Sequence, residues 1–176
     1  DLYVPKYQLG IELNGCYWHT TDKGKDQFYH INKTNLCKEK GVKLLHFWDY
    51  EWIEKQDVVK GMIQNHLGNS IKVPARKTHV AEISSKQTNM FLKENHLMGA
   101  ARSAYRIGLF HEGELVQLLT FGKNRFKKDN IELIRFSTKL GYRVQGGFQK
   151  LLKHALDKWH FSKIRTYADL RYSQGN

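Results

Sequence analysis

Long hydrophobic runs and cysteines are scarce in this sequence of 176 residues. Its apolar runs are only a few residues long, whereas a transmembrane helix needs about 20 apolar residues, so we expect no membrane-spanning segment. The first residues lack the basic and apolar segments of a secretory signal peptide. Only two cysteines are present, and they lack the spacing of a zinc-binding motif. This usage is typical of a reduced, cytoplasmic protein.

Arginine is absent from residues 1–74, which carry 10 lysines against 9 acidic residues. Residues 75–176 instead carry 19 lysines and arginines against 8 acidic residues, so nearly all of the net charge of +12 lies there. A strongly basic half is typical of a protein that binds a polyanion, although a solubilising surface is the plainer alternative. We therefore expect double-stranded DNA as the partner.

Hydrophobic periodicity divides the chain into two α/β runs, with a boundary near residues 68–78. The expected elements are strands 2–4 and 9–13, helix 26–40, strand 42–48, helix 54–67, strand 79–83, helix 84–97, strands 105–110, 115–121 and 131–138, helix 146–159 and strand 163–167. They predict an α/β fold with domains at residues 1–72 and 73–176. The chain lacks an initiator methionine and ends directly after a strand, so we expect a fragment of a longer protein.

The opening stretch gathers side chains that bind metals and transfer protons. Asp1 and Glu12 lie on neighbouring strands, where two carboxylates could share one Mg²⁺ ion, with Mn²⁺ as the alternative. Glu12 and Asn14 are two residues apart and face the same side of their strand, with Leu13 facing the core between them. His19 follows the strand and is placed to act as a general base. Each residue alone is more often solvated or packed, but the group favours a site.

A run of Gly-Cys-Tyr-Trp-His at residues 15–19 follows Asp1 at the spacing found in the very short patch repair endonucleases. The stretch resembles still more closely the phage-type homing endonucleases that are built on the same core. Both belong to the PD-(D/E)XK, or restriction-endonuclease-like, fold, so the resemblance implies such a nuclease core over residues 1–70. It also implies Asp1 as a metal ligand and His19 as the base, with Asn14 in the place of a Lys or His. A phage-encoded protein would act in the cytoplasm of the host cell.

Two residues of the expected helix 26–40 extend this resemblance. His30 and Lys33 are three positions apart and share one helix face. Lys33 is placed to supply the cation that Asn14 does not, with a solvated lysine as the equal alternative. His30 is placed either to assist the scissile phosphate or to pack at the edge of the core.

The second half resembles a GNAT-type N-acetyltransferase, particularly the Mom-like DNA-modification branch found in phages. The resemblance is carried by Arg143-Val144-Gln145-Gly146-Gly147-Phe148, which matches the Arg-x-x-Gly-x-Gly/Ala loop that holds a pyrophosphate at a helix N-terminus. It implies that Arg143, Gly146 and Gly147 bind acetyl-CoA. Phe148 stands in the last small-residue slot, where its side chain would crowd the cofactor, and this argues against acetyl-CoA.

Basic side chains in this half are placed to contact phosphates, with a salt-dependent affinity that is mostly independent of sequence. The expected DNA-binding residues are Trp18, Lys123, Arg125, Lys127, Lys128, Lys150 and Lys153. A solvated loop is the alternative for residues 123–128. Residues 167–171 end the last strand with polar groups, which we expect to line a cleft of the second half.

These features together predict a magnesium-dependent DNA endonuclease of the homing type, which hydrolyses phosphodiester bonds with its first domain and grips DNA with its second. Two alternatives stay open. One is a Mom-like, acyl-CoA-dependent transferase that modifies a DNA base. The other is a DNA-binding module without catalysis. The sequence does not predict the oligomeric state.

Overall fold

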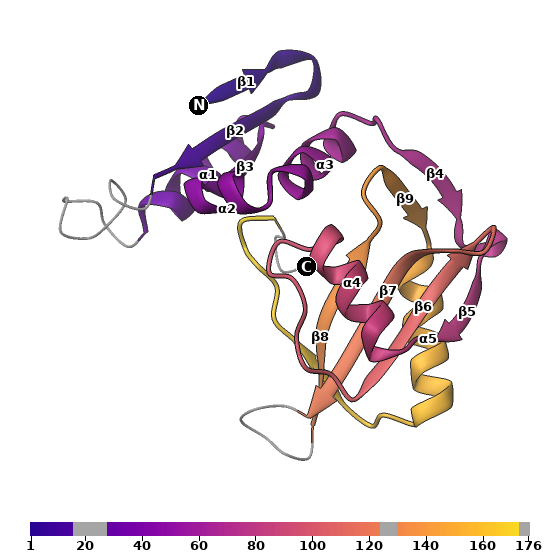
Figure 1. The fold of residues 1–176 in the computed structure, drawn as a ribbon. Coiled ribbons are helices and arrows are strands. Elements are labelled where there is room, and N and C mark those ends of the chain that lie inside the picture. The colour runs from indigo at the N-terminus through magenta and orange to yellow at the C-terminus, as the bar shows by residue number, and fades with distance from the viewer. Residues whose placement is uncertain (16–27, 124–129, 173–176) are drawn as a thin grey trace. The chain divides into compact units, whose positions relative to one another are not determined.

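The computed structural model describes residues 1–15, 28–123 and 130–172 (Figure 1). The chain forms two compact units, which we describe separately. The first unit comprises Asp1–Leu67 and Ala168–Asn176, and the second comprises Gly68–Tyr167. Residues 168–172, close to the end of the chain, are therefore part of the first unit.

The first unit is built on a three-stranded sheet of order β1-β2-β3. Strand β1 is antiparallel to β2, and β2 is parallel to β3. Its elements are β1 (Leu2–Val4), the 3-10 helix η1 (Pro5–Tyr7), β2 (Leu9–Asn14), α1 (Tyr29–Glu39), β3 (Lys43–Trp48), α2 (Asp49–Glu54) and α3 (Gln56–His66). Helix α1 lies in the connection between β2 and β3, as a crossover between parallel strands requires.

The core of this unit forms where β3 meets its neighbours. Leu45 and Phe47 of β3, Leu9 of β2 and Val59 of α3 are almost fully buried. The apolar run of β3 suits the middle of the unit, because this strand lies against both the sheet and the helices. The expected helix 54–67 corresponds to α3, and α2 adds a separate short helix that begins directly after β3.

The second unit contains a five-stranded sheet of order β10-β8-β7-β6-β5 and a separate parallel pair, β4 with β9. All neighbours in the larger sheet are antiparallel except β8 and β10. The elements are β4 (Ile71–Pro74), η3 (Ala75–Lys77), β5 (His79–Glu82), α4 (Ser85–Asn95), β6 (Tyr105–His111), β7 (Glu114–Lys123), β8 (Ile131–Thr138), β9 (Tyr142–Gln145), α5 (Gly147–Trp159) and β10 (Ile164–Thr166).

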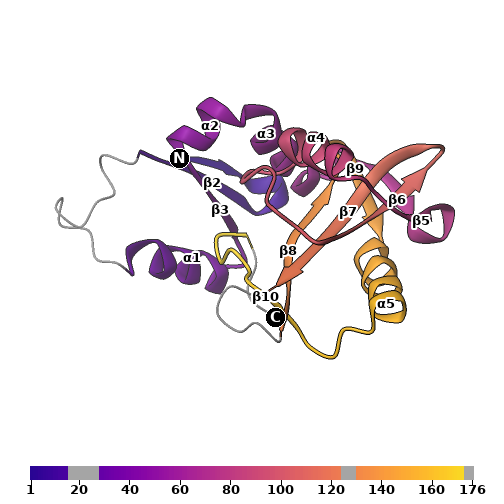
Figure 2. The same ribbon diagram turned by 60° about the horizontal axis from the view of Figure 1, so that its bottom comes forward.

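Helices α4 and α5 cover opposite faces of the five-stranded sheet, as Figures 1 and 2 show. Leu119 packs in the core under α5, together with Leu151 of that helix. Its neighbour Leu118 packs in the core under α4, together with Leu92, because successive residues of a strand point to opposite faces. The hydroxyl of Ser84 caps α4 by accepting a bond from the Gln87 N–H at 3.2 Å.

The structure confirms a mixed α/β fold, and most of the expected helices and strands are present within a few residues of their predicted bounds. The pairing of β4 with β9 was not predicted. Among the described residues, the helices are too short or too polar to cross a membrane.

Candidate functional sites

Three polar side chains lie inside the first unit where its two parallel strands pair. Glu12 and Asn14 of β2 and His46 of β3 are 4%, 0% and 2% exposed, and the register places Glu12 opposite His46. Leu13 between them is half exposed, so the prediction that Leu13 faces the core is wrong. Burial of polar groups is costly unless they find partners, and the contacts of these side chains therefore decide what the cluster can do.

Thr34 of α1 contacts the ring of His46. The Thr34 hydroxyl lies 2.9 Å from the His30 carbonyl and 2.8 Å from Nε2 of His46. This hydroxyl has one proton, so it either donates to the His30 carbonyl and accepts Nε2–H, or donates to Nε2 and leaves the ring proton on Nδ1. Burial lowers the pKa of His46, and the Glu12 carboxylate opposes this only in part. The neutral form of the ring is therefore favoured, and its Nδ1 faces Glu12 in either tautomer.

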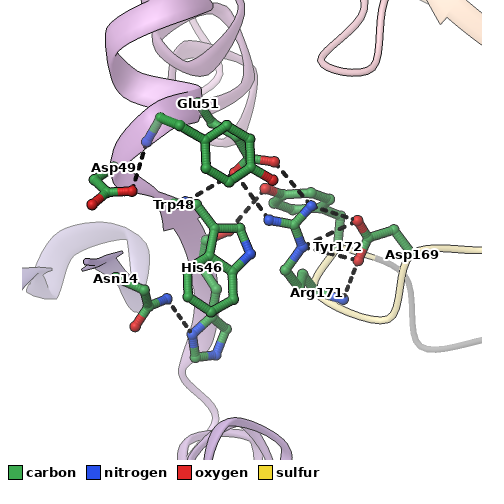
Figure 3. Close-up of polar contacts among 9 residues, drawn as sticks. Asn14, His46, Trp48, Asp49, Glu51, Asp169, Arg171 and Tyr172 are labelled. Atoms are coloured by element: carbon green, nitrogen blue, oxygen red, sulfur yellow. Dashed lines mark hydrogen bonds and ion pairs between the residues drawn. The ribbon is translucent and has the colours of Figure 1, made fainter. Parts of the chain in front are cut away.

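Two groups face this Nδ1 atom. Oε2 of Glu12 lies 3.3 Å away. The amide nitrogen of Asn14 lies 3.4 Å away (Figure 3). Oε2 of Glu12 is buried and has no hydrogen-bond partner among the described residues. A carboxylate oxygen and an imidazole nitrogen therefore lie side by side in the core.

Lys33 of α1 lies between the two carboxylates that were expected to share Mg²⁺. Its ammonium is 2.8 Å from Oε1 of Glu12 and 3.2 Å from Oδ2 of Asp1. A lysine thus supplies the positive charge expected from the ion. The ring of His30 lies edge-on to that of His46, with centroids 5.5 Å apart.

The structure thus brings together Asp1, Glu12, Asn14, His30 and Lys33, which were all predicted as site residues. The predicted residues Trp18 and His19 lie outside the described residues. His46, at the centre of the cluster, was missed. Its signal in the sequence is a single ionisable residue within the apolar stretch 44–48.

The end of the chain binds the first unit through Arg171 and Tyr172 (Figure 3). Arg171 donates to both carboxylate oxygens of Glu51, at 2.9 and 3.0 Å, and to Asp169 at 2.7 Å. Burial alone would lower the pKa of Arg171, but its hydrogen bonds to Asp169 and Glu51 outweigh this effect and raise the pKa. The Tyr172 hydroxyl donates to the His46 carbonyl at 2.8 Å, and burial raises its pKa. The prediction that residues 167–171 line a cleft of the second half is wrong for Asp169 and Arg171.

The second unit carries the residues that were expected to bind coenzyme A, around the turn from β9 into α5. Gly146 has a φ of +75°, which side chains rarely adopt, and no side chain among the described residues caps the helix. The first amides of a helix have no intrahelical acceptor, and Arg143 on β9 is exposed. The turn therefore offers N–H groups and a guanidinium to an anion.

Gly147 also allows α5 to pack closely against β7. A Cβ atom at residue 147 would lie 2.0 Å from Oε1 of Gln117. Gln117 is buried on β7 and donates to the Thr138 hydroxyl at 2.8 Å. A side chain at residue 147 would therefore have to displace the Gln117 side chain.

A cavity of about 350 Å³ lies beside α5. Phe148 and Leu152 of α5, Leu133 of β8 and Ile164 of β10 are among its lining residues. The Phe148 ring packs edge-on against Phe136, with centroids 5.2 Å apart. Any crowding by the Phe148 side chain therefore occurs in this cavity.

The predicted DNA-binding lysines differ in their surroundings. The ammonium of Lys150 donates to the carbonyl of Ala75 at 2.9 Å and to that of Thr78, so it ties α5 to η3. Lys123 and Lys153 are exposed. The other three, Arg125, Lys127 and Lys128, lie outside the described residues.

No protein-family profile and no curated protein matches this chain. Two solved structures match part of it. One is a ribosomal-protein-alanine N-acetyltransferase from Brucella melitensis biovar Abortus 2308, with 15% identity and a TM-score of 0.38. The other is an aminoglycoside acetyltransferase from an uncultured soil metagenomic sample, with 16% identity and a TM-score of 0.39. Each match covers 52% of this chain and 80% of the other chain.

These comparisons correct the prediction of a magnesium-dependent endonuclease. Both matched structures are acetyltransferases of a GNAT-like α/β fold, and neither is a hydrolase that acts on DNA. No comparison supports a PD-(D/E)XK segment at residues 1–70 or a requirement for Mg²⁺. In the first unit, Lys33 already neutralises the two carboxylates that the nuclease hypothesis gave to the ion.

Proposed function

We propose that residues 68–167 form an acyl-CoA-dependent transferase unit, in which the turn from β9 into α5 binds the pyrophosphate of the cofactor. The observation that carries this proposal is the combination of a left-handed Gly146, an uncapped helix start and the exposed Arg143. Free amides at a helix N-terminus and a guanidinium are suited to a phosphate group.

The surroundings of the turn fit such a cofactor. The cavity beside Phe148 is apolar in most of its lining and lies along the same helix as the turn. Arg76 and Lys77 of η3 are exposed, and the chain at Ala75 lies 3.6 Å from the Cβ position of residue 146. These groups add positive charge close to the helix start. Coenzyme A, when bound, supplies the acyl group as a thioester.

Isothermal titration with coenzyme A tests the proposal. We expect the wild-type chain to bind coenzyme A and Arg143→Gln to bind it about tenfold more weakly, which is the contribution of one charge-assisted hydrogen bond. Arg102→Gln is the matched control, because Arg102 is also exposed and lies outside the turn. Absence of binding at millimolar coenzyme A, or equal affinity in the Arg143 variant, would overturn the proposal.

We propose double-stranded DNA as the acceptor or partner of this unit. Support comes from the charge of residues 75–176, where basic residues outnumber acidic ones by 19 to 8. Binding should weaken as salt is raised, and Lys153→Gln should reduce the slope of log K against log salt by about 0.9. Lys150→Gln should leave the slope unchanged, because backbone carbonyls hold its ammonium. Salt-independent binding would exclude this partner.

A direct assay separates transfer from binding. Release of free thiol from acetyl-CoA is measured with and without a DNA duplex. DNA-stimulated release that Arg143→Gln abolishes supports transfer to DNA, whereas DNA binding without thiol release supports the non-catalytic alternative.

A further inference from the structure

We propose that Glu12, His30 and His46 of the first unit form a binding site for a first-row transition-metal ion, with Zn²⁺ as the leading candidate. The site lies in a different unit from the proposed acyl-CoA site and does not depend on it. It also differs from the Mg²⁺ site first expected at Asp1 and Glu12, because two of its three ligands are histidines.

The three ligands come from three elements that the fold brings together. Glu12 lies on β2, His30 on α1 and His46 on β3, and one donor atom of each lies within 4.8 Å of the others. Two imidazoles and a carboxylate suit zinc and its neighbours in the first transition row, whereas Mg²⁺ prefers oxygen ligands alone. Such a set leaves a fourth position for water or a substrate group.

The separation of two donor atoms already fits a tetrahedral ion. Zinc–ligand bonds to nitrogen and oxygen are about 2.0–2.2 Å long, so neighbouring ligand atoms of a tetrahedral site lie about 3.3–3.6 Å apart. Oε2 of Glu12 and Nδ1 of His46 are 3.3 Å apart. The donor atom of His30 lies within 4.8 Å of the donor atoms of Glu12 and His46.

One carboxylate oxygen of the cluster lacks a donor. Oε2 of Glu12 is buried, has no hydrogen-bond partner among the described residues and lies 3.3 Å from Nδ1 of His46. When the ring proton of His46 is on Nε2, these two atoms can bind a cation between them. The Asn14 amide reaches Nδ1 only at 3.4 Å and does not contact Oε2 of Glu12 within hydrogen-bond distance.

Neighbouring residues hold the ligands as outer-shell partners do in metal sites. The Thr34 hydroxyl lies 2.8 Å from the ring nitrogen of His46 that does not face the site, so it can accept Nε2–H when Nδ1 binds a metal. His30 and Thr34 are one turn apart on α1, so the same helix face supplies a ligand and a support.

Zinc titration of the full chain tests the proposal, with Zn²⁺ alone as the probe. We expect one ion per chain, and a loss of affinity of more than about 100-fold for each of His30→Gln, His46→Gln and Glu12→Gln, which exceeds the effect of an outer-shell change. Thr34→Val should lose about 10- to 100-fold. His66→Gln is the matched control, because His66 is an exposed histidine at the end of α3 in the same unit.

Two further measurements keep the test decisive if a buried variant misfolds. Circular dichroism identifies variants that have lost their fold, and His30→Gln changes only a half-buried side chain. The visible spectrum of the Co²⁺-loaded wild type should show the intense bands of a four-coordinate ion. A weak octahedral spectrum, unchanged zinc affinity in folded His30→Gln, or a proton shared between Glu12 and His46 in NMR spectra with saturating zinc would each overturn the proposal.

Discussion

Replacement of Arg171 by methionine should destabilise the first unit by about 3 kcal/mol. The guanidinium makes two hydrogen bonds to Glu51, which is 5% exposed. Without it, the described contacts leave this buried carboxylate with the Trp48 N–H at 2.9 Å. Removal of one partner from a buried ion pair costs about 3–5 kcal/mol. Because the side chain of Arg171 is 24% exposed, we expect the lower end of that range.

Hydrogen exchange at the amides of β3 measures this loss in the first unit alone. Since each 1.4 kcal/mol is a factor of ten, the slowest amides should exchange about 100-fold faster in Arg171→Met. Arg102→Met, at an exposed site of the second unit, should leave them unchanged. Glu51→Gln in the Arg171→Met background should restore part of the protection, because an unpaired amide is cheaper to bury than a carboxylate. If Arg171→Met matches Arg102→Met, the reasoning fails.

The ion pair between Arg171 and Asp169 predicts a dependence on pH. Burial raises the pKa of Asp169, but hydrogen bonds from Arg171 outweigh it, and the pKa is lowered overall. A carboxylate whose pKa is lowered by folding stabilises the fold above its unfolded pKa, and this is lost as the pH falls through the lowered value. Protection of β3 should therefore decrease below about pH 4, and the decrease should be smaller in Arg171→Met. An equal decrease in both proteins would contradict this assignment.

Three other substitutions test the two sites. Gly147→Ala should cost about 1–3 kcal/mol by displacing Gln117, and faster hydrogen exchange in β7 would show it; unchanged exchange would contradict the packing role. Phe148→Ala should strengthen coenzyme A binding in calorimetry by enlarging the cavity, so weaker binding would argue against the pocket. Lys33→Met should tighten zinc binding about tenfold. The reason is that a positive charge about 5–6 Å from a divalent ion repels it by about 1.4 kcal/mol even at high dielectric. Unchanged affinity would place the ion elsewhere.

Elements with strong local signals were predictable from the sequence. Helix α5 shows a regular apolar face, and Ser84 with Gln87 forms the capping pair that starts α4. The parallel pair of β4 and β9 has no such signal. Each strand has only four residues and the two lie far apart in the chain, so their hydrophobic pattern is too short to predict the pairing. The contact between Arg171 and Glu51 was not predicted for a related reason, since the two residues lie 120 positions apart.

The candidate site of the first unit was predicted in its residues but not in its chemistry. Asp1, Glu12 and Lys33 do meet, yet the motif that placed them implied a nuclease, which the comparisons do not support. A local motif specifies which side chains are near one another along the chain. It does not specify whether a lysine or an ion neutralises two carboxylates, because that depends on how α1 lies against β2.

Stability alone does not explain the polar cluster in this unit. Glu12, Asn14 and His46 occupy the core of a three-stranded sheet, where apolar residues of similar volume would often be neutral or stabilising. Oε2 of Glu12 lacks a hydrogen-bond partner among the described residues and lies 3.3 Å from Nδ1 of His46. Most buried polar atoms in proteins have a hydrogen-bond partner. The two atoms are spaced as metal ligands, and the zinc ion proposed above would give Oε2 its missing partner.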